Sequence, residues 1–126
     1  MSVARLKYTV SPTLVRTSPP ASSTFYMPSS AVEGIDFFDV RALDKMLVEV
    51  DADQPITVEI ENSPTGNVAD ARPLAGYMIP STSFDTARRN TIAMDGADAC
   101  VGFIRFRVTT GATAPSSIKI WIEAKL

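Results

Sequence analysis

The segment Ile118-Lys-Ile-Trp-Ile-Glu-Ala-Lys125, close to the C-terminus, carries isoleucine or alanine at every second position. Successive side chains of a β-strand point to opposite faces of a sheet, so this spacing predicts a strand with one buried face and one face in water. An amphipathic helix would need a consistent stripe of apolar residues three and four positions apart, which the segment lacks. The same alternation occurs in three other segments: Met46–Asp51, Ile56–Glu61 and Ile104–Thr109.

Turn-forming residues separate these segments in pairs. Asp51–Pro55 lies between the first two segments, and Gly111–Ser117 lies between the last two. Each pair is therefore expected to form a β-hairpin. The alternation assigns the following residues to the core: Val58, Ile60, Ile104, Phe106, Ile120 and Ile122.

Weaker signals complete an all-β domain. Val68–Leu74 is compatible with one helical turn, which Pro73 limits. About eight short strands with this alternation predict an all-β fold, an antiparallel β-sandwich or jelly roll. The weaker strand candidates are Arg5–Val10, Ile35–Val40, Gly76–Ile79 and Thr91–Met94.

The segment Ser11–Ser30 differs from the rest, with four Pro, six Ser and three Thr among its 20 residues. Such a composition builds no core of its own and favours an extended chain. Its apolar patches, Leu14-Val15 and Phe25-Tyr26-Met27, favour an arm that docks on the domain or on a neighbouring subunit over a flexible linker. The expected organisation is an N-terminal strand and extended arm at residues 1–30, followed by a β-sandwich domain at residues 31–126.

Composition excludes several classes of protein. The chain has 126 residues, the size of a single domain. Its net charge of −2 gives no basic footprint for nucleic acid. No apolar run approaches the roughly 20 residues that span a bilayer. The N-terminus lacks the apolar segment of a signal peptide, so synthesis and retention in a cytoplasm are expected.

The residues needed for common catalytic chemistry are also missing. The chain has no histidine, no glycine-rich phosphate loop, and a single cysteine, Cys100, expected to be a buried apolar residue. Two acidic pairs, Asp51/Asp53 and Asp95/Asp98, could offer oxygen atoms to calcium, but neither has the spacing of a known calcium loop. The sequence therefore predicts a protein that is not an enzyme and has no cofactor and no metal.

One group of side chains predicts binding to another protein. Trp121 alternates with charged residues, so it is expected on the wet face of its strand. Phe103 has the same parity as Arg105 and Arg107, and a terminal hairpin would place these side chains near Trp121. Exposed Trp, Phe and Arg together are typical of the centre of an interface. An alternative is that the arm, through Phe25-Tyr26, covers this patch. The candidate interface residues are thus Phe25, Tyr26, Phe103, Arg105, Arg107 and Trp121.

The charged residues of the two expected hairpins differ in sign. If the hairpins lie side by side in one sheet, these charges pair internally. If they lie in separate sheets, the subunit has faces of opposite sign, suited to head-to-tail packing. The first hairpin carries Glu49, Asp51, Glu59 and Glu61, and the second carries Arg105, Arg107, Lys119 and Lys125.

Four stretches together resemble small virion proteins of tailed bacteriophages: Ile35–Val50, Ile56–Gly66, Val101–Thr109 and Ser117–Lys125. The resemblance is one of strand and turn order, covers roughly Ile35 to Leu126, and involves no invariant chemical residue. It implies a β-sandwich that acts as a capsid decoration or cement protein, binding the major capsid protein or other virion proteins. It also implies a homo-oligomer located in the virion after synthesis in the host cytoplasm.

Two alternatives to a decoration protein stay open. A tail, neck or fibre component of a virion would have the same strand pattern. Carbohydrate-binding or adhesive modules with a jelly-roll fold have related patterns, and they usually present several aromatic residues on one face. In this sequence only Trp121 and Phe103 are candidates for such a face.

Overall fold

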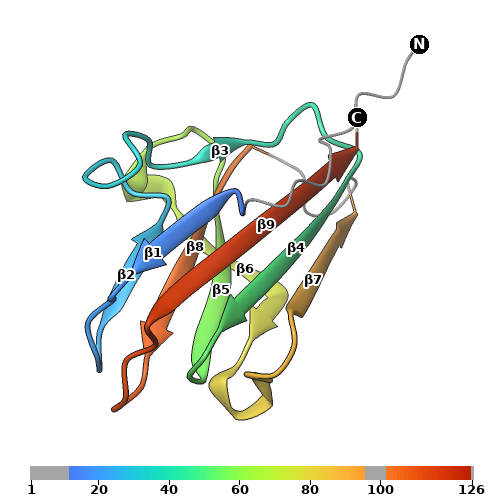
Figure 1. Ribbon diagram of the computed structural model, residues 1–126. Coiled ribbons are helices and arrows are strands. Elements are labelled where there is room, and N and C mark those ends of the chain that lie inside the picture. The colour runs from blue at the N-terminus through green and yellow to red at the C-terminus, as the bar shows by residue number, and fades with distance from the viewer. Residues whose placement is uncertain (1–11, 96–101, 126) are drawn as a thin grey trace.

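The computed structural model describes residues 12–95 and 102–125, which form two antiparallel sheets packed face to face (Figure 1). This confirms the predicted all-β sandwich. Sheet A has the order β1-β9-β4-β7 and sheet B the order β2-β8-β5-β6, with β3 also paired to β8. The strands of sheet A are β1 (Leu14–Thr17), β9 (Ser117–Lys125), β4 (Lys45–Ala52) and β7 (Asn90–Asp95). The strands of sheet B are β2 (Thr24–Met27), β8 (Phe103–Thr110), β5 (Ile56–Ser63), β6 (Arg72–Ile79) and β3 (Phe38–Asp39).

The core lies between the inner faces of the two sheets. All six residues that the alternation assigned to the core are buried: Val58, Ile60, Ile104, Phe106 and Ile120 are fully inaccessible and Ile122 is 9% exposed. Two short 3₁₀ helices, Val68–Asp70 and Ser81–Ser83, interrupt the loops on either side of β6. No helix within residues 12–95 and 102–125 is long and apolar enough to cross a membrane.

Both hairpin predictions are wrong. β4 and β5 belong to opposite sheets, as do β8 and β9, so each short loop crosses from one sheet to the other. β4 pairs with β9, and β5 pairs with β8, along their full lengths. Alternation could not separate the two arrangements, because a strand buries one face whether its sequence neighbour lies beside it or across the core.

The Pro/Ser-rich segment supplies an edge strand to each sheet. β1 pairs with β9, and β2 pairs with β8, so the surface on which this segment docks is the chain's own sandwich. Thr110 holds the connecting loop by donating from Oγ1 to the carbonyl oxygen of Pro20 at 2.7 Å. At the same edge, Arg16 pairs with Glu33 at 2.9 Å and lies 5.2 Å from the Phe25 ring centroid. Phe25 is partly buried against the core, so it lies on the inner side of sheet B, whereas Tyr26 lies on the outer side.

The weaker strand candidates have mixed outcomes. Ile35–Val40 contains only the two-residue strand β3, whereas Gly76–Ile79 and Thr91–Met94 are parts of the longer β6 and β7. Val68–Leu74 forms a single 3₁₀ turn before β6 begins at Arg72. Arg5–Val10, Cys100 and Asp98 lie outside the described residues.

Candidate interaction surface

The outer face of sheet B carries a cluster of aromatic, arginine and glutamate side chains. Residues in register across the sheet share this face: Tyr26 lies opposite Arg107, Arg107 opposite Glu59, and Glu59 opposite Met78. Two residues before Arg107 on β8, and on the same face, Arg105 lies opposite Glu61. We call this surface the sheet B face; it comprises Tyr26, Phe37, Arg41, Glu59, Glu61, Met78, Phe103, Arg105 and Arg107.

A buried ion pair forms the middle of the sheet B face. Arg105 donates from Nε to Glu61 Oε1 at 2.9 Å, and its Nη2 lies 2.9 Å from the same oxygen. The guanidinium lies 3.6 Å from the Tyr26 ring centroid and 5.2 Å from that of Phe37. Arg105 and Glu61 are each only 6% exposed. The expectation that Arg105 is solvent-exposed is therefore wrong, because aromatic rings from two other segments cover it.

The neighbouring ion pair is more accessible. Arg107 Nη1 lies 3.4 Å from Glu59 Oε1, and the two side chains are 43% and 23% exposed. Next in register, Met78 is 49% exposed. These residues give the sheet B face an open side toward β6, where apolar, cationic and anionic groups are all accessible to a partner.

Phe103 closes the other end of the face. The Arg41 guanidinium lies 4.7 Å from its ring centroid, and Arg41 pairs with Asp39 at 2.7 Å. On the other side of the ring, a Cβ atom at Gly66 would stand only 3.4 Å from the Phe103 ring. Gly66 also has a φ of +81°, so a larger residue there would be strained as well as crowded.

The hydrogen bonds from Arg41 lower the pKa of the Asp39 carboxyl to about 2. The folded-state pKa is thus below the ordinary value, so this contact stabilises the fold above about pH 4 and is lost as the pH falls through about 2. We expect an NMR titration of the Asp39 carboxyl to show a midpoint near pH 2. In Arg41→Gln the midpoint should rise toward the ordinary value, whereas Arg88→Gln should leave it unchanged. The same midpoint in Arg41→Gln as in the wild type would show that the Arg41–Asp39 pair does not form in solution.

Trp121 lies away from the sheet B face. It belongs to β9 in sheet A, whereas Phe103 belongs to β8 in sheet B, so the expected neighbourhood of the two rings is wrong. Trp121 is also buried, at 6% exposure, rather than solvent-exposed. Arg89 covers its ring at 3.9 Å from the centroid and pairs with Glu49 at 3.3 Å. Period-two alternation contains no signal for this cover, which comes from a loop.

The charges of the two sheets are interleaved. Acidic β4 lies beside β9, with Asp51 opposite Lys119, and acidic β5 lies beside basic β8. Neither expected arrangement therefore occurs. In sheet B, Arg105 pairs with Glu61 and Arg107 with Glu59, whereas in sheet A Asp51 and Lys119 lie opposite each other without an ion pair. The physical reason is the crossing of both short loops between sheets, which brings each acidic strand next to a strand of the other expected hairpin.

The calcium candidates are placed only in part. Both carboxylate oxygens of Asp53 accept hydrogen bonds from Ser116, at 2.8 Å from the backbone nitrogen and 2.6 Å from Oγ. Within the described parts of the chain, no three His, Cys, Asp or Glu side chains gather as potential metal ligands. The Asp95/Asp98 pair is not placed, because Asp98 lies outside those parts.

Comparison with known proteins identifies no family for this chain. No family model matches it, and no curated protein matches it. Among solved structures, it is similar to a protein described as "xylan-binding module CBM15", with a TM-score of 0.48 and 11% sequence identity over 99% of this chain and 96% of the other. So distant a likeness carries no argument about ligands or partners.

Proposed function

We propose that the chain is a non-catalytic structural protein that attaches to another protein through the sheet B face. The observation that supports this proposal is the gathering of partly exposed Tyr26, Phe103, Arg107 and Met78 on one sheet surface. Tyr, Phe, Met and Arg are enriched at protein interfaces relative to the rest of a surface. Four of the candidate interface residues lie on this face, namely Tyr26, Phe103, Arg105 and Arg107.

The arginines of this face are held in place before any partner binds. Arg105 is fixed by Glu61 and Tyr26, and Arg107 pairs with Glu59. Long side chains that are already ordered lose less conformational entropy on association. A rigid surface of this kind suits repeated attachment to an equally regular partner surface.

The resemblance to virion proteins of tailed bacteriophages favours a capsid as that partner. We therefore propose a capsid decoration or cement protein that contacts the major capsid protein and neighbouring copies of itself. A carbohydrate-binding role for the sheet B face is less favoured, because guanidinium groups already stack on the Tyr26 and Phe103 rings. Sugars bind aromatic residues mainly through such ring faces.

The direct test is quantitative mass spectrometry of purified virions from the phage that encodes the chain. A decoration protein should be present at a copy number comparable to that of the major capsid protein. A few copies per particle would instead indicate a neck, tail or fibre component. Absence from the particle would contradict a virion role altogether.

Met78→Lys tests the attachment surface. The variant places a charge at the exposed, apolar side of the sheet B face, and it should weaken binding to particles by about 2 kcal/mol or more, as for an interface hot spot. The matched control is Val15→Glu, which places a charge on the 40% exposed Val15 of sheet A. Binding of both purified variants to particles that lack the protein can be followed by co-sedimentation. Equal binding of Met78→Lys and wild type would place the attachment surface elsewhere.

A further inference from the structure

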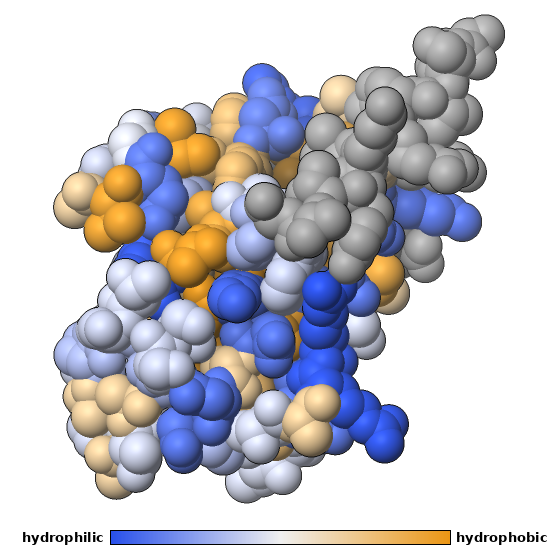
Figure 2. All heavy atoms as spheres, in the orientation of Figure 1, coloured by the Kyte–Doolittle hydropathy of each residue, from blue (hydrophilic) through white to orange (hydrophobic). Residues whose placement is uncertain are grey.

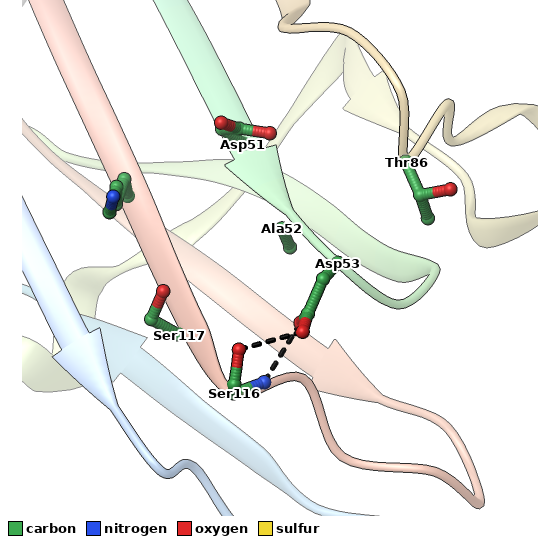
Figure 3. A pocket seen from close by; sticks show the side chains of 7 residues that line it. Asp51, Ala52, Asp53, Thr86, Ser116 and Ser117 are labelled. Atoms are coloured by element: carbon green, nitrogen blue, oxygen red, sulfur yellow. Dashed lines mark hydrogen bonds between the residues drawn. The ribbon is translucent and has the colours of Figure 1, made fainter.

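A polar hollow of about 240 Å³ lies at the end of the sandwich where the β4–β5, β6–β7 and β8–β9 loops gather (Figures 1 and 3). Three segments supply its lining: the end of β4 with the following turn, the start of β9 with the preceding loop, and the loop before β7. Hydrophilic side chains are prominent at this end of the molecule in Figure 2. The lining residues are Asp51, Ala52, Asp53, Thr86, Ser116, Ser117 and Lys119.

Asp53 fixes the shape of the hollow. Its two oxygens accept the hydrogen bonds from the backbone nitrogen and the hydroxyl of Ser116. Figure 3 shows these bonds joining the β4–β5 turn to the β8–β9 loop. They also lower the pKa of the Asp53 carboxyl, which favours its ionised form. The site is therefore built before any ligand arrives.

Two charged side chains in the hollow are not used by the fold. Asp51 and Lys119 lie directly opposite each other on β4 and β9. Neither forms an ion pair or hydrogen bond with any residue in the part of the chain that the structure describes. The same holds for the hydroxyl groups of Thr86 and Ser117. The hollow thus offers one strong acceptor, one strong donor and two hydroxyls to a ligand.

The charges select the class of ligand. Calcium requires about 6–8 oxygen ligands, whereas here the Asp53 oxygens are already engaged and Lys119 would repel a cation. The carboxylates of Asp51 and Asp53 would repel an anion. An apolar molecule would leave the polar lining without hydrogen bonds, which is unfavourable. A neutral molecule that both donates and accepts hydrogen bonds at adjacent positions fits this lining.

We propose that this hollow binds one sugar residue, whose adjacent hydroxyl groups donate to Asp51 and accept from Lys119. The hollow is smaller than the clefts of about 300–1,000 Å³ that take drug-sized ligands, in keeping with a single sugar ring. Binding at one such open site is weak, and display of many copies on one particle would raise the overall avidity. The site lies outside the sheet B face, so it does not depend on the proposed attachment.

The test is an NMR titration of the ¹⁵N-labelled full chain with the methyl glycosides of glucose, galactose, mannose and xylose. At least one glycoside should give saturable shifts at the amides of Thr86, Ser117 and Lys119. Asp51→Asn and Lys119→Gln should each weaken this binding about tenfold or more, since each replaces a charged hydrogen-bonding group with a neutral one. Cyclohexanol, which has no adjacent hydroxyls, should give no saturable shifts.

Glu123→Gln and Lys45→Gln are matched controls, because both residues lie on β9 or β4 with the same parity as the pocket residues but outside the hollow. Both should bind the glycoside as wild type does, and so should Met78→Lys, which separates this site from the attachment surface. Absence of shifts with all four glycosides would overturn the proposal. Shifts with calcium chloride or glycine but not with glycosides would also overturn it, in favour of an ion site.

Discussion

Replacing Phe106 by alanine is expected to lower the free energy of unfolding by about 3–5 kcal/mol, as for truncation of a core aromatic residue. Phe106 is fully buried at the centre of β8, in register with Met27 on β2 and Ile60 on β5, which are also fully buried. Paired strands, β2 on one side and β5 on the other, prevent the site from collapsing, so a cavity should remain. Urea denaturation monitored by circular dichroism measures the change.

Phe38→Ala is the comparison for that result. Phe38 is only partly buried against the same core and lies on the two-residue strand β3. It should therefore cost clearly less stability than Phe106→Ala. A loss of under about 1 kcal/mol in Phe106→Ala would mean that β8 does not turn this side chain into the core.

The strands with the strongest alternation in the sequence are the central ones. The four segments with unbroken alternation became β9 and β4 in the middle of sheet A, and β8 and β5 in the middle of sheet B. Central strands bury one whole face, so every second side chain must be apolar. Edge strands need fewer apolar residues. β6 is mostly exposed along its length, and the sequence predicted a strand only for its second half, Gly76–Ile79.

The pairing of these strands could not be predicted in the same way. Alternation is a local property, and it is identical for a hairpin and for a loop that crosses the core. The decisive interactions join residues far apart in sequence, such as β9 with both β1 and β4. The Pro/Ser-rich composition of Ser11–Ser30 likewise concealed two edge strands, each of only four residues.

The interaction surface was predictable as a face but not as an arrangement of contacts. Parity correctly placed Phe103, Arg105 and Arg107 on the outer side of β8. It could not show that Tyr26 covers Arg105, or that Arg89 covers Trp121. Outward orientation and exposure to solvent are separate properties, and a second layer of side chains distinguishes them. The sheet B face also contains Phe37, Arg41 and Met78, which the alternation pattern did not indicate.

The buried ion pair under Tyr26 leads to the second large effect. Arg105→Met should lower the free energy of unfolding by about 3–5 kcal/mol, because it leaves the carboxylate of Glu61 buried without its partner. The matched control is Arg107→Met on the same strand and face. Its pair with Glu59 is partly exposed, so its loss should cost no more than about 1 kcal/mol. Urea denaturation of both variants measures the difference.

The double variant Arg105→Met/Glu61→Met tests two contributions to the free energy of unfolding. One is the loss caused by a buried unpaired charge, and the other is the stabilisation that the ion pair itself provides. With both charges gone, nothing ionised stays buried, and methionine side chains can pack beneath Tyr26 and Phe37. The double variant should therefore be more stable than Arg105→Met by about 2 kcal/mol or more, although it contains one substitution more. If it is instead less stable than Arg105→Met, the pair itself contributes most of the stability. In that case the ion pair between Arg105 and Glu61 would itself hold the Tyr26 ring in place on the sheet B face.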